Sequence, residues 1–222
     1  MKAMILAAGL GTRMRPLTDH CPKPLLTVAG KPLIVHHLER LAAAGITDIV
    51  INVSYRADQI VEALGDGRRF GVSLTFSHEA TPLETAGGLR HALPALGDAP
   101  FLLLNGDVWS DIDLATLPRL GDDLAHLILV DNPVHHARGD FALDENGRVR
   151  LDGAACLTYA GLAILDPALV AGLPDDVPAK LAPLLREAIV EDRVGGTHHC
   201  GGWVDVGTPE RLATLDEHLR GV

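Results

Sequence analysis

The glycine-rich segment after the first apolar run constrains the fold of this chain more than any other feature. Lys2–Ala8 suits a short buried strand, and Gly9-Leu10-Gly11 follows it directly. Glycines at such a turn let the backbone approach a ligand closely, and the neighbouring N–H groups can point at an anion. Arg13 and Arg15 add charged donors that suit phosphate oxygens. The segment therefore predicts a strand that ends in an anion-binding loop.

Two common phosphate-binding motifs do not match this loop. No Walker A string is present, and the dinucleotide fingerprint would need glycine at position 14, which is Met14. An ordinary turn with solvated arginines is the alternative interpretation. The strings TR, PLT and PKPL that follow favour a phosphate site, because the prolines around Lys23 restrict the backbone that presents its charge.

Strand-like and helix-like patterns alternate over the next hundred residues. Apolar or β-branched runs at 48–53, 73–78, 101–104 and 125–130 predict strands. Helical spacing predicts helices over 32–44, 56–64, 85–96, 180–191 and 209–219. This order predicts a Rossmann-like, three-layer α/β/α fold with a mainly parallel central sheet.

The pattern changes after residue 131. Residues 141–143 and 149–151 flank a polar turn and predict a β-hairpin, and 157–165 predicts another strand. We expect 131–165 to be a small β insertion within a single domain that spans residues 1–222, since 222 residues suit one domain.

Charge and cysteine content exclude several classes of protein. The net charge of −10 argues against general binding of nucleic acid or of anionic membranes, which needs a basic surface. Residues 1–40 nevertheless carry +4, which leaves −14 for the remainder. Three separated cysteines without a CxxC pair support neither a disulfide framework nor a zinc ribbon. Without a secretory leader or an apolar run of about 20 residues, we expect a reducing, cytoplasmic location.

Two aspartates are candidate metal ligands. Asp107 follows the apolar run 101–104, and Asp205 follows Trp203-Val204 in a similar setting. Ligand sites of open α/β sheets lie beyond the carboxyl ends of strands, where carboxylates distant in sequence can converge on Mg²⁺. The alternative is that each aspartate only caps the turn or helix that follows.

Histidine pairs form a second, weaker candidate for metal binding. His36-His37, His135-His136 and His198-His199 are adjacent pairs among eleven histidines. Adjacent side chains point apart on helices and on strands, so such pairs do not chelate one ion. We expect surface or packing roles for these pairs.

The motifs together resemble those of sugar-phosphate nucleotidyltransferases, which join a nucleoside triphosphate to a sugar 1-phosphate. The similarity rests on Leu6–Thr18, Pro22–Leu25, Asn105-Gly106-Asp107 and Trp203–Thr208. It implies the nucleotide-diphospho-sugar transferase fold, UTP and a sugar 1-phosphate as partners, and Mg²⁺ held by Asp107 and Asp205. It also implies roles for other residues. Catalysis is expected from Arg13, Lys23 and Asp107; nucleotide binding from Ala7, Ala8, Gly9, Gly11, Thr12, Arg13, Lys23, Glu79, Pro82, Thr85, Gly87 and Gly88; and sugar-phosphate binding from Asn105, Gly139, Asp140 and Gly161.

Some assignments stay open at this level. Gly87 and Gly88 weaken a helix, so they serve either close helix packing or contact with a flat base, and the resemblance favours the base. The runs 132–141, 83–85 and 180–185 resemble the members that transfer UMP to N-acetylmuramic acid α-1-phosphate during cell-wall recycling. The alternatives are transfer of GMP to mannose 1-phosphate, another small sugar 1-phosphate, or a nucleotide-sugar sensor without activity.

Overall fold

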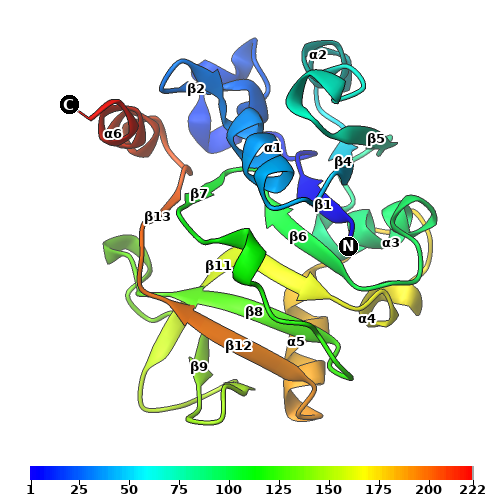
Figure 1. The fold of residues 1–222 in the computed structure, drawn as a ribbon, viewed down its shortest axis with the longest axis vertical. Helices are drawn as coiled ribbons and strands as arrows, with labels where there is room; N and C mark the ends of the chain where they lie inside the picture. The colour runs from blue at the N-terminus through cyan, green and yellow to red at the C-terminus, as the bar shows by residue number, and fades with distance from the viewer. Residues whose placement is uncertain (222) are drawn as a thin grey trace.

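A nine-stranded mixed sheet forms the centre of the computed structural model, which describes residues 1–221 (Figure 1). The sheet order is β10-β9-β11-β6-β1-β4-β5, and β8 and β12 extend it from β11. Its strands are β1 (Ala3–Leu6), β4 (Asp48–Val53), β5 (Ser73–His78), β6 (Phe101–Asn105), β8 (Ala125–Val130), β9 (Phe141–Leu143), β10 (Val149–Arg150), β11 (Cys156–Leu165) and β12 (Val194–His199). Two small ribbons lie outside it: β2 (Thr27–Val28) with β3 (Lys31–Pro32), and β7 (Val108–Ser110) with β13 (Trp203–Asp205).

Most strands of the large sheet run in one direction. β6, β1, β4 and β5 pair in parallel, and β12 pairs in parallel with β8. β11 is antiparallel to both β6 and β8, so those two strands share a direction. The prediction of a mainly parallel central sheet is therefore confirmed.

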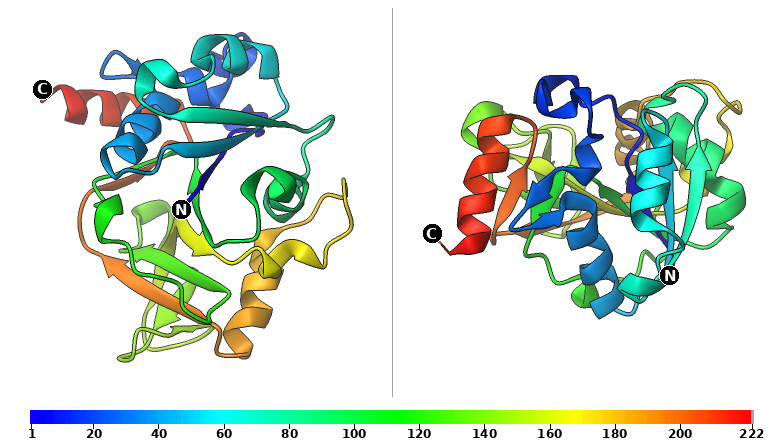
Figure 2. Two further views of the ribbon diagram at one scale, coloured as in Figure 1. Left: turned by 45° about the vertical axis from the view of Figure 1, so that its right-hand side comes forward. Right: turned by 90° about the horizontal axis from the view of Figure 1, so that it is seen from above.

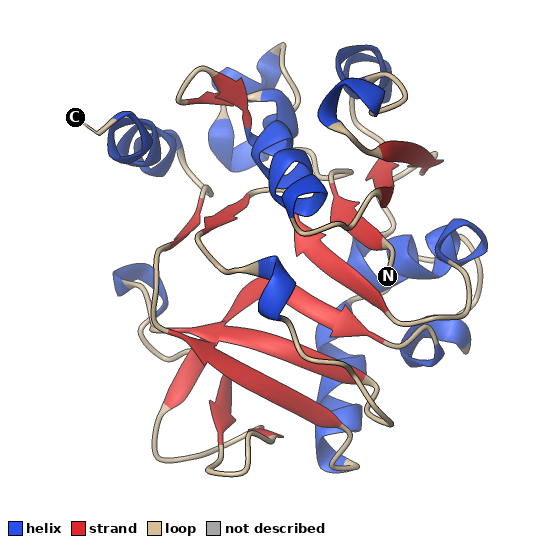
Figure 3. Cartoon of the chain, in the orientation of Figure 1, coloured by secondary structure: helices blue, strands red, loops and turns tan. Residues whose placement is uncertain are grey.

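Helices cover both faces of this sheet (Figure 3). They are α1 (Leu33–Ala43), α2 (Ala57–Leu64), α3 (Glu84–Leu96), α4 (Ala168–Ala171), α5 (Leu181–Val190) and α6 (Pro209–Arg220). Successive residues of β1 point to opposite faces: Ile5 packs in the core cluster that contains α1 and α2, and Met4 packs in the cluster of α3, α4 and α5. The three-layer arrangement follows from strands that are apolar on both faces.

The last helix covers the segment that follows the glycine-rich loop (Figure 2). Leu215 of α6 packs in a third core cluster with Met14 and Val28. Asp216 Oδ1 accepts a hydrogen bond of 2.7 Å from the Ala29 N–H, and Thr208 caps the helix by accepting from the Arg211 N–H. The C-terminal segment thus fixes the N-terminal loop region in place.

The strands within residues 131–165 belong to the large sheet. β9 and β10 form the predicted antiparallel hairpin, but Leu162–Leu165 of β11 lies between β6 and β8 inside the large sheet. The strand is almost fully buried along this stretch, so its apolar run belongs to the main core. An apolar run predicts a buried strand, but it does not reveal which strands lie beside it.

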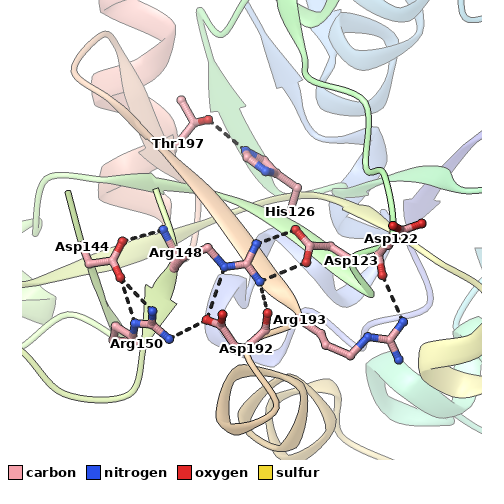
Figure 4. Close-up of polar contacts among 9 residues, drawn as sticks. All are labelled: Asp122, Asp123, His126, Asp144, Arg148, Arg150, Asp192, Arg193 and Thr197. Atoms are coloured by element: carbon pink, nitrogen blue, oxygen red, sulfur yellow. Dashed lines mark hydrogen bonds and ion pairs between the residues drawn. The ribbon is translucent and has the colours of Figure 1, made fainter. Parts of the chain in front are cut away.

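A charged network anchors the β9–β10 hairpin to the segments that lead into β8 and β12 (Figure 4). Arg148 binds the Asp123 carboxylate with both terminal nitrogens, at 2.7 and 2.9 Å. Arg150 Nη1 lies 2.6 Å from Asp192 Oδ1, and this contact lowers the pKa of Asp192. Bidentate arginine–carboxylate contacts fix orientation as well as distance, so the network sets the position of the hairpin.

None of the helices within residues 1–221 is both long and apolar enough to cross a bilayer.

Candidate active site

A cavity of about 480 Å³ lies at the carboxyl ends of β1, β4 and β6. Parallel α/β sheets place their ligand sites at this edge. The wall contains Ala7, Ala8, Gly9, Gly11, Thr12, Arg13, Lys23, Glu79, Pro82, Thr85, Asn105 and Asp107 from the predicted set, and also Leu6, Leu10, Met14, Pro24, Asn52, Glu84, Gly106 and Gly207. Most of the predicted nucleotide-binding residues and all three predicted catalytic residues are therefore brought together.

The two glycines of the loop have different structural roles. Gly11 has φ +63°, and a Cβ there would lie 3.0 Å from Thr18 Cγ2. The protein itself therefore requires glycine at this position. A Cβ on Gly9 would meet no protein atom within 4 Å, although Gly9 lies on the cavity wall. The missing side chain at Gly9 leaves open space on the cavity side of the loop.

Close packing at the end of β6 places Asp107 beside the loop. The Gly106 N–H donates to Leu6 O at 3.0 Å, and a Cβ on Gly106 would lie only 2.5 Å from that oxygen. Asp107 Oδ2 then lies 2.5 Å from Lys23 Nζ. The Lys23 side chain is 11% exposed and that of Asp107 is 35% exposed, so this ion pair is partly shielded from solvent.

The β7–β13 ribbon brings Asp205 next to Asp107, although Asp205 is not among the residues of the cavity wall. β13 pairs antiparallel with β7, and the Val206 N–H donates to Asp107 O at 2.9 Å. The Asp205 carboxylate accepts from Arg211 Nη1 at 2.9 Å and is not the α6 cap, which is Thr208. The structure therefore excludes the capping alternative for Asp205 and brings the backbones of the two aspartates side by side.

The donor set at this ribbon suits a hard divalent cation. Asp107 and Asp205 supply carboxylate oxygens, and each carboxylate is balanced here by a basic side chain, Lys23 or Arg211. Residues 1–221 contain no group of three or more histidine, cysteine or acidic side chains placed to hold a metal. Mg²⁺ commonly takes one or two carboxylates and completes its shell with substrate phosphates and water. The residues present fit that requirement.

A buried polar chain, which the sequence did not reveal, connects two walls of the cavity. Asn52 Oδ1 accepts from the Ala7 N–H at 2.7 Å, and Asn52 Nδ2 donates to Glu79 Oε1 at 2.7 Å. Glu79 Oε2 accepts from the Leu83 N–H at 2.8 Å. Asn52 and Glu79 are 3% and 5% exposed. The only sequence signal for Asn52 is a polar residue near the end of an otherwise apolar strand.

Gly87 and Gly88 do not line the cavity. A Cβ on Gly87 would lie 2.5 Å from Val177 O, and a Cβ on Gly88 would lie 2.6 Å from Glu79 Oε1. Both glycines are therefore explained by close packing of α3, which was the less favoured of the two interpretations. Contact of either glycine with a base stays a prediction.

The four residues predicted to bind the sugar phosphate are not all at the cavity. Asn105 lines it, and Gly161 lies behind Asn105, whose Nδ2 is 2.8 Å from the position of a Gly161 Cβ. Gly139 and Asp140 are not part of the wall. Asp140 instead accepts from the Tyr159 N–H at 2.8 Å and contacts His136 Nε2 at 3.0 Å, so it links the turn before β9 to β11.

The members of each histidine pair have separate surroundings. His135 Nε2 contacts Arg211 and His136 contacts Asp140, while His198 contacts Asp131 and His199 contacts Asp111. His36 contacts Val28 O, and His37 is buried in α1, where burial lowers its pKa to about 4. The two members of each pair therefore face different partners, and their expected lack of metal binding stays a prediction.

A family model described as nucleotidyl transferase matches residues 2–150, about two-thirds of the chain. The chain belongs to the nucleotidyl transferase family. The match includes the glycine-rich loop, Lys23 and Asp107, whereas Asp205 lies beyond it.

Relatives of this nucleotidyl transferase cover nearly its whole length. An N-acetylmuramate alpha-1-phosphate uridylyltransferase of Neisseria meningitidis is 52% identical over 220 residues, which are 96% of this chain and 95% of that protein. A protein of the same name from Caulobacter vibrioides is 39% identical over 98% of this chain and 96% of its own length. A mannose-1-phosphate guanyltransferase of Emericella nidulans is 37% identical over 96% of this chain and 63% of its own length.

Solved structures share the fold at lower sequence identity. A Bacillus anthracis protein described as a glucose-1-phosphate thymidylyltransferase, in complex with sucrose, superposes with a TM-score of 0.86 at 22% identity and covers 100% of this chain and 96% of its own. HddC from Yersinia pseudotuberculosis, complexed with GMP-PN, gives 0.78 at 22% identity, covering 98% of this chain and 99% of its own. These likenesses confirm the predicted nucleotide-sugar transferase fold.

Proposed function

We propose that this nucleotidyl transferase transfers UMP from UTP to N-acetylmuramic acid α-1-phosphate, forming UDP-N-acetylmuramic acid and pyrophosphate. The observation that carries the proposal is the 52% identity to the Neisseria uridylyltransferase over almost the full length of both chains. The reaction returns a recovered cell-wall sugar to its nucleotide-activated form in the cytoplasm. The cavity at the end of β1 and β6 is the proposed site for both substrates.

The cavity residues support a direct displacement at the α-phosphorus of UTP. An oxygen of the sugar 1-phosphate attacks, the bond to the β-phosphate breaks, and pyrophosphate leaves with the electron pair. The attacking phosphate oxygen is already ionised at neutral pH, so no general base is needed. Positioning and charge stabilisation therefore carry most of the catalysis.

The basic residues of the first forty positions have distinct proposed roles. The open backbone at Gly9 and the loop up to Arg13 receive the triphosphate, and Arg13 neutralises the leaving pyrophosphate. Lys23 is held at the cavity wall by its contact with Asp107. Its ammonium group binds the α-phosphate of UTP and the phosphate of the incoming sugar 1-phosphate. These groups oppose charge that accumulates during the displacement.

Asp107 and Asp205 are the residues that would hold Mg²⁺. The bound ion supplies neutralisation of phosphate charge and orientation of the phosphates. In the structure, Lys23 balances the Asp107 carboxylate and Arg211 balances the Asp205 carboxylate.

Transfer of GMP to mannose 1-phosphate is the second candidate, because a mannose-1-phosphate guanyltransferase is 37% identical over 96% of this chain. Pyrophosphate release should be measured with UTP, GTP, ATP and CTP against N-acetylmuramic acid, mannose, glucose and N-acetylglucosamine 1-phosphates. We expect the highest kcat/KM with UTP and N-acetylmuramic acid 1-phosphate. A higher value for another pair contradicts the substrate assignment, and binding of UTP without turnover on any sugar indicates a sensor.

A further inference from the structure

Glu84, the first residue of α3, combines a place on the cavity wall with an unfavourable backbone conformation. Its φ is +58°, in the left-handed region that glycine adopts freely and that other residues adopt at a cost. A glycine would therefore serve the backbone better at this position. The conformation raises the question of what the glutamate side chain contributes.

The other four non-glycine residues with positive φ each have a visible structural partner. The Ala29 N–H donates to Asp216 at 2.7 Å, and Arg56 donates to the Tyr55 hydroxyl at 2.9 Å. Asp176 contacts His91 at 2.7 Å, and Asp192 accepts from Arg150 at 2.6 Å. Glu84 differs from them, because its exposed carboxylate makes no hydrogen bond or ion pair with any residue between 1 and 221.

The charge of Glu84 suits the N-terminal end of α3, but its carboxylate makes no hydrogen bond at the helix start with any of residues 1–221. The N–H groups of Ala86 and Gly87 both donate to Ala179 O, at 2.8 and 3.1 Å, so a neighbouring segment already occupies these donors of the first turn. Within the described residues, no side chain forms a capping hydrogen bond to α3. The remaining surroundings of the Glu84 side chain are the cavity and the solvent.

The charge of the site narrows what such a carboxylate can bind. The loop that carries Arg13, together with Lys23, supplies the positive charge that phosphates need, whereas Glu84 repels phosphate. Glu84 shares the wall with Pro82 and Thr85. A carboxylate without an internal partner accepts hydrogen bonds, and a nucleotide and a sugar 1-phosphate both offer hydroxyl donors away from their phosphates.

We propose that Glu84 is a specificity-determining residue that accepts a hydrogen bond from a substrate hydroxyl, either on the ribose of the nucleotide or on the ring of the sugar 1-phosphate. The proposal rests on the proposed function insofar as the cavity takes these two substrates. In this account the left-handed conformation persists because it aims the carboxylate at that hydroxyl.

Replacement by glycine separates a functional role from a structural one. Glu84→Gly relieves the backbone, so its thermal unfolding midpoint should equal or exceed that of the wild type. Its kcat/KM should fall about tenfold or more, the loss expected when a hydrogen bond to a charged group is removed. Glu84→Gln keeps one acceptor oxygen and should fall between the two. Ala29→Gly, which changes a positive-φ residue away from the cavity, is the matched control and should keep full activity.

The source of the hydroxyl is read from which substrate is affected. If Glu84 contacts the ribose, Glu84→Gly should raise the KM for UTP. The wild type then already uses 2′-deoxyUTP or 3′-deoxyUTP less well, and the substitution should leave the kcat/KM for that analogue unchanged. Loss of a sugar contact raises the KM for the sugar 1-phosphate equally with every nucleotide. Full kcat/KM in Glu84→Gly, or a lowered unfolding midpoint with activity lost in proportion, would overturn the proposal.

The kinetic constants of each variant are compared with those of the wild type on the substrate pair that the wild type uses best. Calorimetric affinities for each substrate give the same comparison without turnover. A wild type that prefers another pair therefore contradicts the proposed function alone, and the effect of the Glu84 substitutions still decides the role of Glu84.

Discussion

Replacement of Asn52 by alanine tests the polar chain between the two cavity walls. The side chain is 3% exposed and makes two hydrogen bonds of 2.7 Å, one from the Ala7 N–H and one to the Glu79 carboxylate. An unsatisfied buried donor costs about 1–3 kcal/mol, and a lost bond to a charged group costs about 1.5–3 kcal/mol. We therefore expect Asn52→Ala to lower the free energy of unfolding by about 3–5 kcal/mol, a large part of the 5–15 kcal/mol typical of a domain.

Urea unfolding followed by circular dichroism measures this loss, and Asn146→Ala, on an exposed turn, is the control that should change stability by less than about 0.5 kcal/mol. Asn52→Asp keeps the acceptor for Ala7 but sets a second carboxyl against Glu79. Like charges in contact raise the pKa of one carboxyl, so this variant should gain stability relative to the wild type as the pH falls from about 7 to 4. The reasoning is refuted if Asn52→Ala loses less than about 1 kcal/mol and its KM for the nucleotide is unchanged.

Three further predictions concern the same region of the protein. Lys23→Ala should reduce kcat/KM by about 3–4 kcal/mol of transition-state stabilisation, measured by pyrophosphate release, and a loss of less than tenfold contradicts a role at the α-phosphate. Asp107→Ala should abolish turnover and keep the far-UV circular dichroism of the wild type; near-normal turnover contradicts the metal assignment. His37 is neutral in the folded protein above about pH 4, whereas the unfolded chain takes up this proton near pH 6.5, so stability should fall by about 3 kcal/mol as the pH drops through that interval. His37→Gln should remove that part of the pH dependence of urea unfolding, and an unchanged pH profile argues against a buried neutral histidine.

The sequence predicts the local elements and the phosphate loop because their signals are local. Gly11 lies close after β1 and Lys23 stands between two prolines, so both can be identified from residues near them in the sequence. The role of Gly87 was harder to predict, because two of its nearest neighbours, Val177 and Ala179, are brought close only by tertiary packing.

Features that depend on contacts between distant segments could not be predicted. The burial of Asn52 against Glu79 and the placement of β11 between β6 and β8 both require the assembled sheet. The conformation of Glu84 was also hidden, since a glutamate at a helix start carries no sequence signal of a left-handed backbone.

The fate of the α-phosphorus of UTP tests the central claim most directly. The purified protein, with Mg²⁺, is mixed with UTP labelled at the α-phosphorus and with N-acetylmuramic acid α-1-phosphate, and the products are separated by chromatography and mass spectrometry. The account predicts that all transferred label appears in UDP-N-acetylmuramic acid, with unlabelled pyrophosphate released in equal amount and no label on the protein. Label bound covalently to the protein contradicts direct displacement, and label that stays in UTP contradicts the proposed reaction.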